Sequence, residues 1–416
     1  MMKHGRLIGY PLDMSKKSLY LERYAYKGIS FEGVEIPKDT EIIVCLPAYK
    51  EPNLCDAIDA ILDTNPIQGH ICILVLVNES EKVSKEIQAI NVQAYQACMK
   101  VATKRGFSLF VEYQSLPAKK AGVGLARKIL MDKAVFLFDQ LNKDGIITCF
   151  DADCTCDPYL FEEIQKAFNG KLNTLITYFE HPLDHDEIVQ YELFLRYHID
   201  SQRYTGFPFA FQTLGSCISV RCSAYMKQGG MNTRQAGEDF YFLHKMAQIG
   251  ELKELNTASI YPSARASDRV PFGTGLAVAK IRSSLEYLVY CPRSYEELKM
   301  LFTQVEMLYK GKGISQTQCL KEFHETHHFD VGLSKAIKNA TSFESFRKHF
   351  FRWWDAFRIL KFLHFARDKY YPEIPLGQAI QTLDNQYWRL GLGSDDLRST
   401  LHQVRAFDRN VDFQIK

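Results

Sequence analysis

Two pairs of acidic residues are the part of this sequence whose types and spacing could support chemistry. Asp151 and Asp153 follow directly on the apolar, strand-like run 146–150, and Glu238 and Asp239 open an amphipathic segment further on. Carboxylates at positions i and i+2 of a strand point to opposite faces, but a turn after the strand lets both converge on one hard cation. The first pair therefore predicts a site for a metal ion and a diphosphate.

Each pair also has a simpler explanation. Asp157-Pro158 is typical of a helix N-cap followed by proline, so the first pair could belong to a solvated loop that caps the next helix. Acidic residues in a first helical turn are favoured by the helix dipole, so Glu238 and Asp239 alone would indicate little. The elements around the acids favour the site.

The elements that must position these acids predict an α/β fold with a mostly parallel sheet flanked by helices. Strand-like runs lie at 41–46, 71–77, 107–113, 145–150, 172–178 and 214–221, with helix-like segments at 54–62, 94–99, 126–138, 158–168 and 240–249. Alternation of this kind is typical of a sheet covered by helices. Ligands of such sheets bind beyond the carboxyl ends of the strands. Segments 47–51, 78–80 and 151–153 are therefore expected to face one crevice.

The composition is that of an ordinary globular enzyme. The chain has 416 residues, of which 46% are hydrophobic and 24% charged, and its net charge is +2. This balance argues against nucleic acid as a partner. The eleven cysteines are scattered, which predicts reduced thiols and a cytoplasmic protein. No apolar run approaches the roughly 20 residues of a transmembrane helix, and the first ten residues do not resemble a secretory signal.

Four segments together resemble the family 2 inverting glycosyltransferases, which use sugar nucleotides and have the GT-A fold. In order, they are Pro47-Ala48-Tyr49-Lys50-Glu51, the segment Lys120 to Arg127, the D-x-D motif at 151–153, and Gly229-Gly230 followed by Gly237-Glu238-Asp239. The resemblance implies a GT-A catalytic domain over 40–275, after an N-terminal extension at 1–39. From residue 276 to 416 the pattern is helical and aromatic, which predicts a helical C-terminal region.

The resemblance also implies a role for each matching residue. Pro47, Tyr49 and Glu51 would line the nucleoside pocket, Lys120 and Gly122 would lie near the donor, Asp151 would contact the ribose or sugar, and Asp153, with Asp151, would hold Mg²⁺ or Mn²⁺ beneath the diphosphate. Asp239 would be the general base, and Glu238 would position the acceptor or brace the loop. The cation would neutralise the leaving diphosphate. One carboxylate would take the proton of an attacking hydroxyl, and a single displacement would invert the anomeric centre.

The sequence departs from the family pattern in two places. Asn78-Glu79 stands where an acid often holds the base of the nucleotide, so the choice of uridine or guanosine stays open. No histidine follows the catalytic helix as a further metal ligand, and Asp268 or water could replace it. Arg265 and Arg269 in that region could bind the diphosphate as bidentate donors or form a basic surface loop.

Other segments support competing hypotheses. His324-Glu325-Thr326-His327-His328 satisfies H-E-x-x-H, the zinc motif of metallopeptidases, although no third ligand is clearly placed. The aromatic and basic stretch 350–371 could lie at a membrane interface, but apolar residues at helical spacing are more often core. Segment 191–211 is a candidate acceptor wall.

The sequence thus predicts a metal-dependent inverting glycosyltransferase. Its donor would be a nucleoside diphosphate sugar, and its acceptor a hydroxyl group of a glycan or a lipid-linked molecule, with peripheral membrane contact left open. The alternatives are a zinc metallopeptidase and a non-catalytic protein that binds sugar nucleotides.

Overall fold

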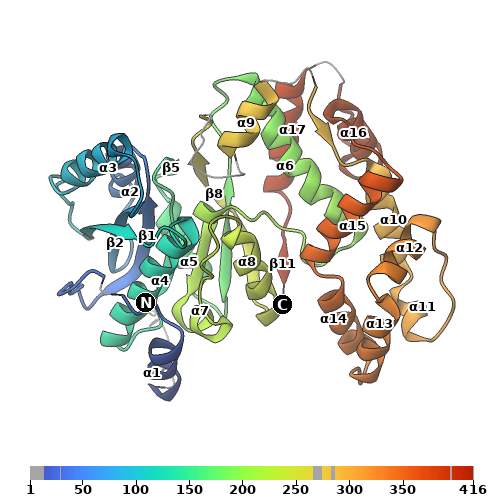
Figure 1. Cartoon of the computed structure of the whole chain (residues 1–416), viewed down its shortest axis with the longest axis horizontal. Helices are drawn as coiled ribbons and strands as arrows, with labels where there is room; N and C mark the ends of the chain where they lie inside the picture. Colours follow the sequence, from blue (N-terminus) through green and yellow to red (C-terminus); the bar gives the residue numbers. More distant parts are fainter. Residues whose placement is uncertain (1–13, 29, 266–273, 283–285, 394–395, 416) are drawn as a thin grey trace, which may run out of the picture. The chain divides into compact units, whose positions relative to one another are not determined.

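The computed structural model describes residues 14–28, 30–265, 274–282, 286–393 and 396–415. The chain divides into two compact units (Figure 1). The first comprises Met1–Pro182, Thr213–Leu276 and Val411–Lys416, and the second comprises Leu183–Gln212 and Ala277–Asn410. Every described residue of the predicted donor, metal and base site belongs to the first unit.

A mixed sheet with mostly parallel strands forms the centre of the first unit. Within the described residues the strand order is β11-β8-β6-β7-β4-β1-β2-β3, with β5 beside β8. The strands are β1 (Thr40–Ala48), β2 (His70–Ser80), β3 (Phe107–Leu116), β4 (Ile146–Cys149), β5 (Cys154–Cys156), β6 (Thr174–Phe179), β7 (Ile218–Arg221), β8 (Leu252–Pro262) and β11 (Gln414–Ile415). Strands β3, β2, β1 and β4 pair in parallel, as do β6 and β8, whereas β7 runs antiparallel between β4 and β6. The predicted sheet is confirmed.

Strands β1 and β2 lie at the centre of the sheet because their sequences are continuously apolar. Ile42 to Leu46 of β1 and Ile71 to Val77 of β2 are buried along their whole length, as expected for strands that are covered on both faces. Val44 pairs with Ile73 on one side and with Thr148 on the other. Because these three strands run in parallel, the loops that follow them leave the sheet at the same edge.

The helices of the first unit pack against this sheet or against one another. They are α1 (Met14–Arg23), α2 (Leu54–Leu62), α3 (Lys85–Cys98), α4 (Val123–Gln140), α5 (Leu160–Ala167), α7 (Cys222–Gln228) and α8 (Glu238–Ile249). Helix α4 packs on β1, β2 and β4 and contacts α1, α7 and α8, whereas α2 contacts α3 and β5. Helix α4 therefore connects the centre of the sheet with the start of α8.

Three strands of the sheet, β5, β8 and β11, are absent from the sequence prediction, and β8 is the longest of them. Strand β8 contains Lys253, Glu254, Asn256 and Thr257, which interrupt its apolar pattern. It forms nevertheless, because β6 pairs with one side of it and β5 and β11 pair with the other. Partners from distant parts of the chain thus decide its conformation.

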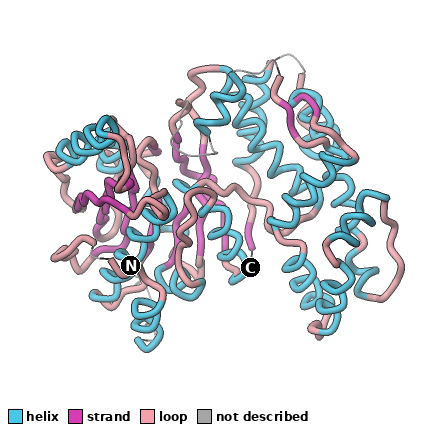
Figure 2. The backbone as a smooth tube through the Cα atoms, viewed as in Figure 1, coloured by secondary structure: helices cyan, strands magenta, loops and turns pink. Residues whose placement is uncertain are grey.

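The second unit is almost entirely helical in its described residues, as Figure 2 shows. Its helices are α6 (Asp186–Thr205), α10 (Pro292–Thr303), α11 (Val305–Tyr309), α12 (Gln318–Thr326), α13 (Phe329–Lys338), α14 (Phe343–Trp353), α15 (Ala356–Lys369), α16 (Leu376–Leu383) and α17 (Leu397–Arg409), with most of α9 (Thr274–Arg282). A short pair, β9 (Leu288–Val289) and β10 (Ile374–Pro375), accompanies them. The predicted helical C-terminal region is confirmed.

Aromatic side chains form the core of the second unit. Trp354 and Phe362 are fully buried, and the ring of Trp354 lies 5.8 Å from that of Phe302 and 5.4 Å from that of Phe323, measured between centroids. The aromatic residues of 350–371 therefore serve largely as core. Among the described residues, no helix combines the length and apolar character needed to cross a bilayer. The predicted acceptor wall forms most of α6, where Tyr197 is buried.

Candidate active site

The first acid pair lies in a tight turn after β4. Phe150 still donates its backbone N–H to Cys45 of β1, over 3.0 Å, so the chain stays beside β1 until Asp151. The N–H of Cys154 then donates to the carbonyl of Asp151, over 3.1 Å, and closes the turn. The turn that the sequence requires for Asp151 and Asp153 to converge is therefore present at the carboxyl end of β4.

Arg127 of α4 connects this turn to the second acid pair. Its guanidinium forms one ion pair with Asp151 and another with Glu238, the first residue of α8. Arg127 and Glu238 are each only 2% exposed. Gly215 makes room for this contact, since a Cβ at that position would overlap the guanidinium. One buried cation thus brings together two carboxylates from distant parts of the chain.

Arg127 has no predicted role, although it is the last residue of one of the four motif segments. Its neighbours on α4, among them Leu125, Ala126, Ile129 and Leu130, are buried apolar residues. A single arginine within such a face must find carboxylate partners, because a buried charge without a partner is strongly unfavourable. That pattern is the signal by which Arg127 could have been found.

Asp239 lies beside this buried ion pair, at the second position of α8. Its Oδ1 accepts a hydrogen bond of 2.7 Å from the backbone N–H of Phe240. Burial and the neighbouring charge of Glu238 raise the pKa of Asp239 to about 7, against the opposing effect of Arg127. A carboxylate whose pKa lies near neutrality is well suited to accept a proton from a hydroxyl group.

The loop that leads to Asp239 rests on the start of α4. A Cβ on Gly124 would overlap the carbonyl oxygen of Arg234, and a Cβ on Gly122 would lie 3.0 Å from the Cα of Gln235. The side chain of Asn232 donates a 2.9 Å hydrogen bond to the carbonyl of Glu238. Gly122 therefore has an observed packing role next to its predicted role near the donor.

A second cluster joins the loop after β1 to the acid turn. Glu51 is 1% exposed, and both of its carboxylate oxygens bond to the guanidinium of Arg265, one of them over 3.1 Å. The same guanidinium lies 3.5 Å from Oδ2 of Asp153. Since β5 pairs with the end of β8, Arg265 is placed directly beside the turn. The structure thus brings Glu51, Asp153 and Arg265 together.

The other predicted site residues lie around these two clusters. Pro47 is part of β1 and pairs with Leu76, and Tyr49 follows the strand in a half-buried position. Asn78 is buried within β2, and Lys120 is exposed in the loop before α4. Arg269 and Asp268 lie outside the described residues.

The residues of the acid turn suit a cation that arrives with a ligand. Asp151 and Asp153 offer the hard carboxylate oxygens that Mg²⁺ prefers, but each also faces an arginine. Within the described ranges, no three His, Cys, Asp or Glu side chains are grouped to hold an ion. Mg²⁺ commonly takes only one or two carboxylates and completes its shell with substrate phosphates and water. Asp151 and Asp153 would be the residues to hold such a cation.

The H-E-x-x-H segment does not form the zinc motif. Helix α12 ends at Thr326, and His328 adopts a left-handed conformation with φ of 54°, so it does not share a helical face with His324. The ring of His324 stacks on Phe329, 3.9 Å away between centroids, and its Nδ1 lies 2.7 Å from the side-chain oxygen of Gln316. This geometry contradicts the metallopeptidase alternative.

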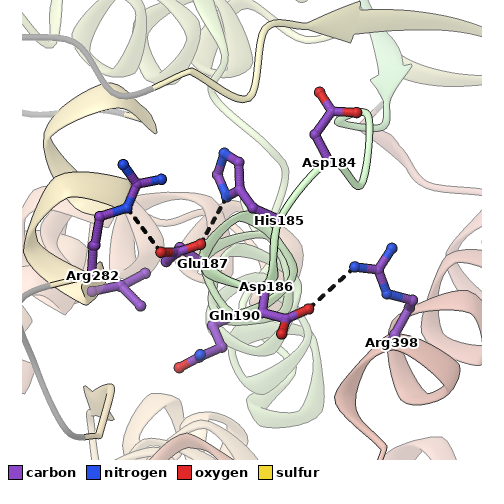
Figure 3. A pocket seen from close by; sticks show the side chains of 8 residues that line it. Asp184, His185, Asp186, Glu187, Gln190, Arg282 and Arg398 are labelled. Carbon is purple, nitrogen blue, oxygen red and sulfur yellow. Dashed lines mark hydrogen bonds and ion pairs between the residues drawn. The ribbon is translucent and has the colours of Figure 1, made fainter.

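A pocket of about 540 Å³ lies in the second unit, at the start of α6 (Figure 3). Five of its charged or titratable side chains form ion pairs with one another (Figure 3). Arg282 donates to Glu187 over 2.9 Å, His185 lies 3.0 Å from the same carboxylate, and Arg398 lies 3.2 Å from Asp186. None of the predicted site residues lines this pocket.

Comparison with known proteins gives distant likenesses to solved structures. No protein-family model matches the chain, and no curated protein matches its sequence. The S. aureus TarS fragment 1–349 in complex with UDP-GlcNAc is 12% identical, covers 89% of this chain and 88% of its own, and has a TM-score of 0.38. A mycobacterial protein is 13% identical, with 67% and 83% covered and a TM-score of 0.33. Likenesses this remote carry no conclusion about fold or activity.

Proposed function

We propose that this protein is an inverting glycosyltransferase that transfers a sugar from a nucleoside diphosphate sugar to a hydroxyl acceptor. The observation that carries the proposal is the pair of contacts made by Arg127, which connects the acid turn after β4 with the acids that open α8. A donor site and a general base must lie side by side for a single displacement. The two acid pairs lie on either side of Arg127 within the first unit, which supports the proposal.

The donor would bind at the edge of the sheet where β1, β2 and β4 end. Glu51 and the half-buried Tyr49 lie in the loop after β1, next to Arg265. A guanidinium can bind phosphate oxygens in the bidentate manner in which it now binds Glu51. We assign Arg265 to the diphosphate, with Asp153 and Asp151 as ligands of Mg²⁺ or Mn²⁺, which when bound would neutralise charge on the leaving group.

Asp239 would act as the general base. Its raised pKa, near 7, leaves a large ionised fraction at neutral pH and keeps the carboxylate basic enough to take the proton of a hydroxyl group. Glu238 is already engaged by Arg127, so its carboxylate is poorly placed to compete for that proton. The assignment of these acids, the inversion and the family 2 mechanism are parts of the same proposal.

A reducing compartment is part of the proposal as well. All eleven cysteines are free thiols in the structure, and most are buried among apolar residues. Free buried thiols are typical of proteins that function where disulfides are kept reduced. This supports the cytoplasmic location.

A thermal-shift screen of UDP and GDP, each with and without Mn²⁺, tests donor binding. A ligand at about 100 times its Kd stabilises the folded state by roughly 2.7 kcal/mol, so one nucleotide should raise Tm by several degrees when Mn²⁺ is present. Asp153→Asn should reduce that shift. Asp63→Asn, at an exposed carboxylate paired with Lys104 on the surface of the first unit, should leave it unchanged.

Turnover distinguishes an enzyme from a protein that only binds sugar nucleotides. Wild-type protein should release the nucleoside diphosphate from UDP-N-acetylglucosamine, UDP-glucose or GDP-mannose, slowly with water and faster with a suitable acceptor. Binding without any release would support the non-catalytic alternative. A chain that neither UDP nor GDP stabilises, with or without metal, would contradict the proposal as a whole.

A further inference from the structure

Arg127 is a buried cation whose guanidinium contacts two acidic side chains. Nη1 contacts Glu238 and Nη2 contacts Asp151. Asp151 is one-third exposed, whereas Glu238 is almost completely buried. Removing one partner of a buried ion pair leaves an uncompensated charge and is strongly destabilising. The positions of the two carboxylates are therefore tied to each other through one guanidinium.

The guanidinium itself is held in one place. It lies so close to Gly215 that any side chain there would overlap both terminal nitrogens. The rigid, planar fork of arginine can contact two carboxylates at once, whereas the single ammonium of lysine is a point charge on a flexible stem. The geometry thus calls for arginine and for glycine at these two positions.

Glu238 is anchored through both its side chain and its backbone. Its carboxylate pairs with Arg127, and its carbonyl accepts the hydrogen bond from Asn232. Asp239 follows directly in the first turn of α8, so the orientation of Asp239 depends on these two anchors. A misplacement of about 1 Å in a reacting group can lower a rate by roughly a hundredfold.

We propose that Arg127 is a positioning residue that couples Asp151, at the donor site, to helix α8, which carries the base Asp239. In this proposal Glu238 acts through Arg127 and does not contact the acceptor. The inference rests on the proposed transferase function and extends it. Arg127 would keep Asp151 and the start of α8 at a fixed distance from each other. The position of Asp239 relative to the bound donor would therefore be fixed as well.

Hydrolysis of the sugar nucleotide by water is the readout that separates the two roles of Glu238. If Glu238 contacts the acceptor alone, Glu238→Gln leaves hydrolysis of UDP-N-acetylglucosamine, UDP-glucose and GDP-mannose unchanged. If Glu238 acts through Arg127, the same variant lowers kcat for whichever donor the wild type hydrolyses. Arg127→Lys keeps the charge but loses the fork, and we expect kcat to fall about a hundredfold with a change in donor KM of less than about fivefold.

Arg221→Met is the matched control for a purely structural arginine. Arg221 lies opposite Ile146, at the other end of β4, and donates to the backbone carbonyls of Asp144 and Phe168. Its replacement should lower Tm and leave kcat per folded molecule at the wild-type value. If Arg127→Lys behaves in the same way, Arg127 is only structural and the inference is wrong.

A double variant keeps the test informative if a single replacement weakens folding. Arg127→Met leaves Glu238 buried and unpaired, so Arg127→Met with Glu238→Gln should melt at a higher temperature than Arg127→Met alone. Equal melting temperatures would overturn the coupling. A wild type that hydrolyses none of the three donors contradicts the proposed function, whereas wild-type turnover that Arg127→Lys and Glu238→Gln leave intact contradicts only this inference.

Discussion

Replacing Asp239 by asparagine should stabilise the protein above pH 7 while it removes most of the activity. The pKa of Asp239 is raised to about 7 in the folded protein, chiefly by burial, from an ordinary value of 3.8. The folded state therefore holds a proton that the unfolded chain has already lost between pH 4 and 7. The protonated carboxyl therefore adds to the free energy of unfolding. This contribution has its full size below pH 4 and is lost as the pH rises through 7.

The size of the effect follows from that difference in pKa. Each pKa unit corresponds to about 1.4 kcal/mol, so ionising Asp239 in the folded state opposes folding by up to roughly 4 kcal/mol at pH 8. An amide carries no charge at any pH, and its oxygen can still accept the hydrogen bond from Phe240. We therefore expect Asp239→Asn to raise Tm by roughly 5–10 °C at pH 8 and by clearly less at pH 5.

Activity should change in the opposite direction. Release of nucleoside diphosphate by the wild type should increase with pH through about 7, as the carboxyl ionises and becomes able to accept a proton. Asparagine cannot accept it, so the rate should fall by roughly 10² to 10⁴. Circular-dichroism melts and coupled nucleotide-release assays between pH 5 and 9 measure both effects.

Asp63→Asn is the control, because the side chain of Asp63 is 71% exposed. It should change neither the rate nor the pH dependence of Tm. An Asp239→Asn variant with wild-type turnover, or with the same gain in Tm at pH 5 and pH 8, would refute the assignment of Asp239 as a base with a raised pKa.

Three further predictions concern the loop, the core of the second unit and the metal. Gly124→Ala should lower both kcat and Tm, because the new Cβ would collide with the carbonyl of Arg234 in the loop that precedes Asp239. Gly170→Ala is the control and should change neither quantity, because its Cβ would point into open space. Trp354→Ala should destabilise the second unit by about 3–5 kcal/mol in urea unfolding, and a loss below 1 kcal/mol would contradict its place in the core. EDTA should abolish the Mn²⁺-dependent shift in Tm with UDP or GDP, and an undiminished shift would exclude a bridging cation.

The parts of the fold that could be predicted are those with a strong local signal. Ile42 to Leu46 and Ile71 to Val77 are long β-branched runs that can be stable only between covering layers, and both are central strands. The turn at 151–153 follows from acids placed directly after such a strand. The left-handed glycines 229, 230 and 237 likewise mark the loop before α8.

The features of the fold and of the site that the sequence did not predict depend on contacts with residues far away in the chain. Arg127 shows only as a charge within an apolar helix face, and nothing local says which acids it binds. Segment 183–212 belongs to the second unit although it is flanked by parts of the first. Strand β8 is likewise a consequence of its neighbours, since its own residues are too polar to indicate a buried strand.

The pairing of β11 with β8 has a consequence for how the chain matures. Gln414 and Ile415 lie beside Lys253 and Leu252, more than a hundred and fifty residues earlier. Strand β5 can pair with Ile260 to Pro262 as soon as β8 is made, but the same edge of β8 at Leu252 and Lys253 stays unpaired until the helical segment before β11 has left the ribosome. An unpaired edge strand is a template for wrong association. The nascent protein should therefore be most prone to aggregate in the interval between the emergence of β8 and the arrival of its last partner.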